Sequence, residues 1–213
     1  MPVVKIENIS DDSCWGLWKI EETPESLMDL SFLSNEEIEE LSRISNLKRK
    51  KEWLGARALL KYVINKHLSW DYRGTFKDEN NKPFLHNHSA HISIAHSFPY
   101  AVALLNRNSA CGIDIEKPKP ALFHVAPKFL NTYEFKNIKH MPENLCLTWA
   151  AKEVLYKLHG KQKLSFKENL HIDPESLNSK KGLINAEIEL SETCTKYSLV
   201  YEIMESYVIC YSL

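Results

Sequence analysis

The chain has 213 residues, of which 44% are hydrophobic and 26% charged, as in an ordinary globular protein with a substantial core. Its 27 basic residues are balanced by 28 acidic ones, so the overall charge indicates neither a nucleic-acid partner nor a membrane surface. There is no apolar stretch near the ~20 residues of a membrane span, no signal-peptide pattern, and no zinc or disulfide spacing among the five cysteines. We therefore expect a cytoplasmic protein with reduced thiols.

The first half of the chain is predicted to contain helices followed by a strand hairpin. Ser34 and Glu37 form a capping-box pattern that opens a helix, because each side chain can bond the backbone N–H of the other residue. The next helix has an apolar stripe at helical spacing, and a polar, turn-rich segment follows it. The predicted elements are a strand at 14–20, helices opening at 34 and spanning 46–67, turns at 70–88, and strands at 91–96 and 100–105.

The second half repeats this order. A strand is followed by an extended loop containing two prolines, then by helices, and three strands close the chain. We therefore predict an α+β fold of two similar lobes, residues 1–108 and 109–213. The elements expected in the second lobe are a strand at 112–116, helices near 122–130, 132–139 and 143–159, and strands at 186–190, 197–204 and 207–213.

Three carboxylates in the second lobe are spaced so that they can meet. Asp114 and Glu116 lie two residues apart on the predicted strand, so both side chains point to one face. Glu153 lies on the predicted helix, one turn before Lys157 and next to Lys152. An oxygen-only site of this kind suits a hard divalent ion such as Mg²⁺. The neighbouring lysines suggest a phosphate as the other ligand of the metal.

Simpler interpretations exist for each of these patterns. An Asp-x-Glu pair can be a charged strand edge, and a Glu–Lys pair one turn apart can be an exposed ion pair contributing ~0.3–0.5 kcal/mol. The basic run at 47–51 can be a solvated helix face, which is the interpretation we favour for Lys50 and Lys51. The histidines invite a zinc site, which we discount because no cysteine lies nearby and the spacing is not tight. They are His86, His88, His91 and His96.

The strand Gly112–Glu116 and the helix Trp149–Lys157 together resemble the signature of Sfp-type 4′-phosphopantetheinyl transferases. These enzymes move the phosphopantetheine arm of coenzyme A onto a serine of a carrier protein. Their pattern is a G-I-D-I/V-E strand and a W-x-x-K-E-x-x-x-K helix, and both are complete here. Segments at 54–60, 81–85 and 92–97 extend the resemblance over roughly residues 45 to 170, in the expected order.

Two positions depart from the pattern of that family. Ala95 stands where the family has serine, which removes one possible hydrogen bond to a phosphate. Asn81 replaces the glycine of the family's G-K-P-x-L turn.

The resemblance implies a fold and a mechanism. The two lobes would be related by a pseudo-twofold axis, with the active site between them. Asp114, Glu116 and Glu153 would bind Mg²⁺ against the pyrophosphate of coenzyme A. Lys152 and Lys157 would add positive charge where charge develops as 3′,5′-ADP leaves. Glu153 is also the candidate general base for the serine of the carrier, and no protein nucleophile is required.

The resemblance also implies a set of coenzyme-binding residues in the first lobe. His96 would donate to the 3′-phosphate of coenzyme A, and Arg57 would contact the nucleotide end through bidentate hydrogen bonds. Lys48, from the basic run, belongs to the same set. Lys82 and Pro83 would shape the turn that holds the adenine.

The expected partners are coenzyme A and an apo acyl or peptidyl carrier protein, with no nucleic acid and no membrane, and the protein is expected to act as a monomer. Two alternatives are kept. One is a non-catalytic module that binds coenzyme A or the carrier protein, and the other is a Mg²⁺-dependent nucleotide hydrolase that uses the same carboxylates.

Overall fold

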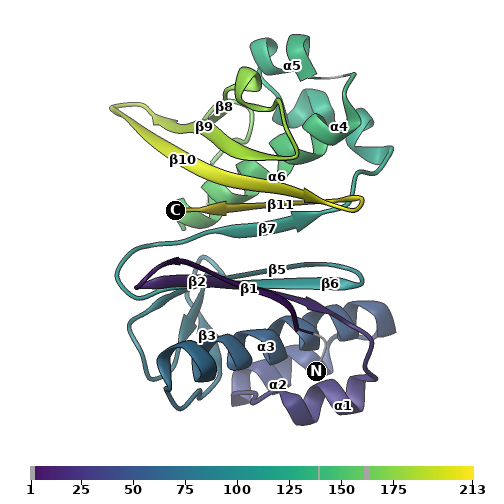
Figure 1. The fold of residues 1–213 in the computed structure, drawn as a ribbon, viewed down its shortest axis with the longest axis vertical. Helices are drawn as coiled ribbons and strands as arrows, with labels where there is room; N and C mark the ends of the chain where they lie inside the picture. The colour runs from purple at the N-terminus through teal and green to yellow at the C-terminus, as the bar shows by residue number, and fades with distance from the viewer. Residues whose placement is uncertain (1–2, 139, 161–163) are drawn as a thin grey trace. The chain divides into compact units, whose positions relative to one another are not determined.

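The computed structural model of the chain describes residues 3–138, 140–160 and 164–213. The chain divides into two compact units, Met1–Cys111 and Gly112–Leu213 (Figure 1). The boundary that the sequence predicts, between residues 108 and 109, lies a few residues before this division. No helix in the described ranges is long and apolar enough to cross a membrane.

The first unit is an antiparallel sheet in the order β1-β2-β6-β5, with helices on one face (Figure 1). The predicted capping box is confirmed, because the Ser34 side chain accepts from the Glu37 backbone while the Glu37 side chain accepts from the Ser34 backbone. The elements are β1 (Val3–Ser10), β2 (Ser13–Lys19), α1 (Pro24–Leu30), α2 (Asn35–Ser42), α3 (Leu47–Leu68), β3 (Thr75–Lys77), β4 (Pro83–Leu85), β5 (His91–Ser97) and β6 (Tyr100–Asn106).

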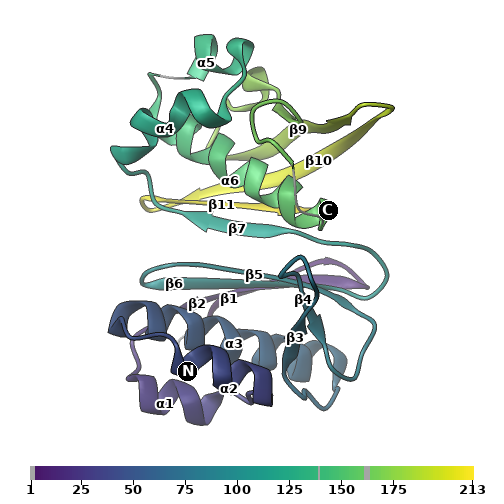
Figure 2. The same cartoon turned by 180° about the vertical axis from the view of Figure 1, so that it is seen from behind.

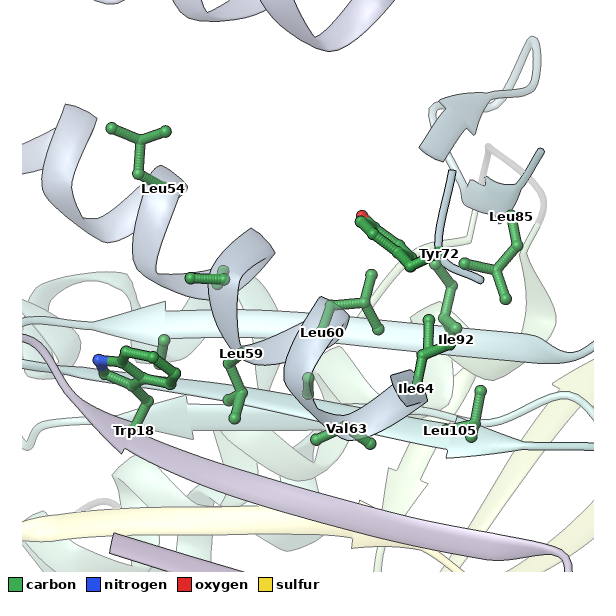
Figure 3. Packing of buried hydrophobic residues seen from close by; sticks show 14 of the residues in the cluster. Trp18, Leu54, Leu59, Leu60, Val63, Ile64, Tyr72, Leu85, Ile92 and Leu105 are labelled. Carbon is green, nitrogen blue, oxygen red and sulfur yellow. The ribbon is translucent and has the colours of Figure 1, made fainter. Parts of the chain in front are cut away.

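Helix α3 forms the core of this unit by lying across the sheet. Leu59, Leu60 and Ile64 on α3 are fully buried, and they face Ile92 on β5 and Leu105 on β6 (Figure 3). The sequence placed this helix within one residue at each end, because its apolar stripe is long and regular. The elements that the sequence missed in this unit are β1, α1, β3 and β4. Strand β1 is half exposed at an edge of the sheet, and the other three are short.

The second unit has a five-stranded sheet in the order β7-β11-β10-β9-β8, with α6 packed on it (Figure 2). The predicted helices and strands all appear, with β8 as an addition, and residue 139 of the predicted helix 132–139 lies outside the described residues. The elements are β7 (Ile113–Glu116), α4 (Ala121–Phe129), α5 (Thr132–Ile138), α6 (Pro142–His159), β8 (Leu170–Ile172), the short 3₁₀ turn η1 (Pro174–Ser176), β9 (Lys181–Leu190), β10 (Thr193–Met204) and β11 (Tyr207–Ser212).

The two units share one chain path. In each, a strand (β2 or β7) is followed by three helices, of which the third is the longest, and then by a closing hairpin. The last strand of each hairpin, β6 or β11, pairs antiparallel with that first strand, and the long helix packs on both. The similarity of the lobes that the sequence suggests is therefore present in the topology of each unit.

Gly112, at the start of β7, lies where this strand passes closest to α6. A Cβ atom at this position would stand 2.7 Å from the carbonyl oxygen of Val154 on α6. This contact is with helix backbone, which cannot rotate away as a side chain can. The glycine that opens the G-I-D-I-E strand is therefore explained by the close approach of the strand and helix that carry the three carboxylates.

We predict that Gly112→Ala lowers the free energy of unfolding by about 1–3 kcal/mol, because α6 must move away from β7. Urea denaturation measures this change. Gly182→Ala is the matched control, since its Cβ would meet only side-chain atoms, none nearer than 3.1 Å, and a smaller loss is expected there. Equal stability of the Gly112→Ala and wild-type proteins would contradict the prediction.

Candidate active site

Strand β7 and helix α6 bring the three predicted carboxylates of the second unit into one electrostatic cluster. Asp114 and Glu116 come from β7, and Glu153 and Lys157 come from α6. The ammonium of Lys157 donates to Asp114 Oδ1 at 2.8 Å and to the carbonyl oxygen of Ile113 at 2.8 Å. Lys157 is therefore more than an exposed ion-pair partner of Glu153 on the same helix, because its ammonium bonds to two residues of β7.

Asp114 is buried, and only one of its two oxygens has a partner. Its side chain is 9% exposed, and Oδ2 is a buried oxygen without a hydrogen bond to any described residue. A buried acceptor without a partner costs about 1–3 kcal/mol. A bound cation or a water molecule would satisfy this oxygen.

The other two carboxylates repel Asp114 and each other. Burial raises the pKa of Glu153 to about 7, and the negative charge of Asp114 adds to this effect. Burial likewise raises the pKa of Glu116, again with a contribution from Asp114. Lys157 contacts Asp114, and the exposed Lys119 lies 3.7 Å from Glu116. Two lysines against three carboxylates leave the cluster with excess negative charge, which a further cation would neutralise.

The cluster fits a hard divalent ion by its chemistry, although the side chains do not converge on one point. Among the described residues, no group of three or more His, Cys, Asp or Glu is arranged to hold a metal ion. Repulsion between like charges keeps carboxylates apart until a cation joins them. Mg²⁺ prefers oxygen donors, and the carboxylates supply only oxygen, including the buried Oδ2 of Asp114.

We predict that, in metal-free protein, Glu153 makes the fold less stable as the pH rises. Its folded-state pKa of about 7 lies above the value of 4.5 for an exposed glutamate. Between these values the folded protein holds one proton more than the unfolded chain, so raising the pH from 4.5 to above 7 lowers the free energy of unfolding, by up to about 3 kcal/mol.

Glu153→Gln should remove this loss, because glutamine stays neutral throughout the range. The measurement is urea denaturation at pH 5 and pH 8 in the presence of a chelator. Glu143→Gln, an exposed position on the same helix, serves as the control and should follow the wild-type protein. If the stability of Glu153→Gln falls as steeply as that of the wild type, the raised pKa of Glu153 is not the cause of the loss, and the prediction is wrong.

The structure places Lys152 away from this cluster, against the sequence-based prediction. Its ammonium is fully buried and makes three short contacts, with Glu134 Oε2 at 2.6 Å and with the carbonyl oxygens of Phe129 at 2.7 Å and Phe166 at 2.8 Å. An ammonium has three hydrogens, so none is left for a phosphate. Sequence reasoning missed Glu134, because a single acidic residue in a short helix gives no sign of burial.

We expect Lys152→Met to destabilise the protein by about 3–5 kcal/mol, because it leaves the buried carboxylate of Glu134 without its partner. The double variant Lys152→Met/Glu134→Gln should recover a large part of this loss, since both charges are then absent. Thermal and urea unfolding of the two variants check this. If Lys152→Met is as stable as the wild type, the buried ion pair is not structural and Lys152 is again a candidate phosphate ligand.

Two of the predicted coenzyme-binding residues lie together in the first unit. Nδ1 of His96 is 3.8 Å from Glu52 Oε2, and the other oxygen of Glu52 accepts from the backbone N–H of Phe98 at 2.9 Å. The ammonium of Lys48 lies 5.4 Å from the centre of the Phe98 ring, with that of Lys51 at 5.9 Å. His96, Lys48 and Lys51 thus form one basic surface beside the start of α3.

Arg57 is not part of that surface, and the structure does not support its predicted phosphate contacts. The side chain is 4% exposed, and Nε donates to Glu37 Oε1 at 3.2 Å. The guanidinium also lies 3.5 Å from the centre of the Trp53 ring and 3.8 Å from a carboxylate oxygen of Glu40. A charged group surrounded by these partners joins α2 to α3, so we assign Arg57 to the core of the first unit.

The turn before β4 explains one departure from the family pattern. Asn81 has a φ of 64°, a left-handed conformation that glycine adopts freely and asparagine tolerates better than most residues. Asp78 closes this turn by accepting from the backbone of Asn80 and Lys82, both at 2.9 Å. Pro83 then begins β4. The turn keeps its shape with asparagine in place of glycine.

The histidines near this turn have separate partners. His88 stacks on Trp70, with ring centroids 4.0 Å apart, and Nε2 of His86 lies 3.4 Å from Glu36. Ala95, the second departure, is part of β5, where it is half buried opposite Val102.

Comparison with known proteins gives one match. Residues 110–212, just under half of the chain, match the model of the 4′-phosphopantetheinyl transferase superfamily. No curated protein matches the chain. The matched segment covers all of the second unit except its last residue, and with it the three carboxylates and Lys157.

Proposed function

We propose that this protein transfers the 4′-phosphopantetheine group of coenzyme A to a serine of an apo acyl or peptidyl carrier protein, releasing 3′,5′-ADP. The observation that carries the proposal is the buried Oδ2 of Asp114, which has no hydrogen bond to any described residue and lies in a cluster of three mutually repelling carboxylates. This cluster lies within the segment that is similar to the 4′-phosphopantetheinyl transferase superfamily. We further propose that the protein acts as a cytoplasmic monomer of the Sfp type.

Asp114, Glu116 and Glu153 would hold Mg²⁺. When bound, the ion would neutralise the pyrophosphate of coenzyme A and polarise the phosphate that is attacked. Asp114 would contribute the buried oxygen, and Glu116 and Glu153, which are half buried, would contribute partly exposed ones.

Lys157 would bind a phosphate oxygen next to the carboxylates. Two of its three ammonium hydrogens are engaged, by Asp114 and by the carbonyl of Ile113, and its side chain is 25% exposed. The remaining hydrogen is available to an oxygen of the pyrophosphate, where negative charge increases as the bond to 3′,5′-ADP breaks. Its position is fixed by the strand, so little rearrangement is needed when the substrate binds.

We assign Glu153 the role of the general base that accepts the proton of the serine hydroxyl. It is half buried on α6, one helical turn before Lys157, and it is a carboxylate in a cluster that favours proton uptake. A serine hydroxyl that attacks phosphorus must lose its proton, and a carboxylate within reach can accept it directly or through one water.

His96 and Lys48 are proposed to contact the phosphates of the coenzyme's nucleotide end. They share one basic surface in the first unit, whereas Arg57 does not belong to it. Lys82 and Pro83 are proposed to place the adenine through the turn that begins β4.

One experiment separates the proposal from its alternatives. The protein is incubated with coenzyme A, Mg²⁺ and several apo carrier proteins, and the mass of each carrier is measured. We expect one or more carriers to gain the phosphopantetheine group and 3′,5′-ADP to appear in equal amount. A carrier that binds without gaining mass would indicate a binding module, and nucleotide breakdown without carrier would indicate a hydrolase.

Asp114→Asn tests the role of the carboxylates in the same assay. Asparagine keeps the shape of the side chain but loses the charge, so we expect at least about a 100-fold loss of rate, since even groups that only support a metal ligand cost 10–100-fold. Excess chelator should abolish transfer in the wild-type protein. Glu143→Gln should transfer at the wild-type rate. Full activity of Asp114→Asn, with unchanged thermal stability, would refute the metal site.

A further inference from the structure

Strand β1 lies at one edge of the sheet of the first unit (Figure 1). It pairs with β2, and no other strand in the described part of the chain pairs with its outer edge. The backbone N–H and C=O groups along such an edge can bond a further strand, and many proteins block their edges for this reason. β1 has eight residues and no proline, and its pairing with β2 is regular from Lys5 to Asn8. The backbone of β1 is therefore suited to pairing with another strand.

The side chains of β1 divide between the two faces of the sheet. Lys5 and Glu7 share one face, where their charged groups are 2.6 Å apart. The ammonium of Lys5 also lies 4.8 Å from the centre of the Trp15 ring on β2, which holds it over the sheet. Val4 and Ile6 share the other face, and they are 51% and 37% exposed. The strand thus presents an ion pair on one face and accessible apolar side chains on the other.

One register of β1 against a second copy of itself sets its opposite charges against each other. If two sheets join antiparallel with their helices on the same side, residues whose numbers differ by an even amount stand opposite each other. Centring the pairing on Ile6 sets Lys5 of each copy opposite Glu7 of the other, twice by symmetry. Centring it on Lys5 would oppose two lysines, and centring it on Glu7 would oppose two glutamates. In the favourable register Val3 also faces Ile9, a second apolar pair beside that of Ile6 with itself.

We propose that β1 binds β1 of a second copy of the chain, antiparallel and centred on Ile6, to form a symmetric dimer with one continuous sheet. The charges of Lys5 and Glu7 then alternate in sign across the contact. The inference does not depend on the proposed function. β1 belongs to the first unit, so the pairing uses none of the three carboxylates, and a single copy remains the catalytic unit that we propose. The dimer forms from such units as their concentration rises.

Sedimentation velocity over a series of protein concentrations measures the association, with a reductant present because Cys194 is exposed. We expect a monomer–dimer equilibrium with a Kd on the order of 10–100 μM, since a single strand gives a small interface. Lys5→Glu should raise this Kd at least about tenfold, because carboxylates then face each other at both contacts. Glu7→Lys should do the same with ammonium groups. A wild-type protein that sediments as a monomer throughout the series would overturn the inference.

A mixture of the two variants tests the register itself. One variant carries two acidic groups on this face of β1 and the other carries two basic groups, so a mixed pair has opposite charges at both contacts. We expect the equimolar mixture to associate at least as tightly as the wild-type protein, although neither variant does so alone. If the mixture associates no more than its components, the copies do not meet in this register and the proposal is refuted.

Two further variants separate the contact from effects on folding or on overall charge. Lys5→Glu/Glu7→Lys keeps an ion pair within the strand and opposite charges across the contact, so it should dimerise like the wild-type protein. Lys196→Glu is the matched control for charge reversal. This lysine is exposed on β10, an interior strand, where it stands opposite Glu187, and its reversal should leave the Kd unchanged. Thermal unfolding of each variant shows that the fold is retained.

Hydrogen exchange locates the contact without any substitution. Backbone amides of β1 that point away from β2 gain acceptors in the dimer, so β1 should exchange more slowly at high protein concentration than at low concentration. Strand β8, at an edge of the sheet of the second unit, should exchange at the same rate at both concentrations. Slower exchange confined to a segment other than β1 would assign the dimer to another surface and refute the proposal.

Discussion

The arrangement of the second unit depends on the buried ion pair between Lys152 and Glu134. Both side chains are fully buried, and taking two charges out of water costs several kcal/mol for each. The cost is offset because every hydrogen-bonding group is satisfied. Lys152 reaches two carbonyls besides the carboxylate, and Glu134 accepts from the backbone N–H groups of Asn131 and Ile172. This network joins α4, α5, β8 and the segment after α6 to α6 itself, which sets the face that α6 turns toward β7.

The other side of α6 carries the opposite electrostatic situation. There Lys157 contacts Asp114 and Lys119 lies near Glu116, while a buried oxygen of Asp114 has no partner among the described residues and the pKa of Glu153 is raised. One helix thus has a buried lysine whose contacts are complete and, beside it in the sequence, a glutamate whose surroundings favour a further positive charge. Lys152 fixes the position of α6 within the second unit, and Glu153 is suited to binding a ligand. The contrast explains how adjacent Lys and Glu residues serve different tasks.

The first unit also has a buried, paired cation on its long helix and basic side chains at its surface. Arg57 is a buried cation paired with Glu37 and packed on Trp53, and it joins helices in the way that Lys152 does. The basic groups at the surface of this unit include His96, with Lys48 and Lys51 beside Phe98. In both units a cation within an apolar segment of the long helix belongs to the core.

The sequence by itself predicted the long helices and the strands of the hairpin that closes each unit, because these depend on local spacing. The meeting of β7 with α6 is a tertiary contact, which the sequence suggested only through the family resemblance. Alternation on β7 puts Asp114 and Glu116 on one face, and the helical repeat of α6 fixes the order of Glu153 and Lys157. What only the tertiary structure decided is which charged side chains are buried. Lys152 and Arg57 looked like phosphate ligands, yet their carboxylate partners, Glu134 and Glu37, are 18 and 20 residues away in the chain. No local pattern encodes such a pairing, since it exists only after the helices have packed.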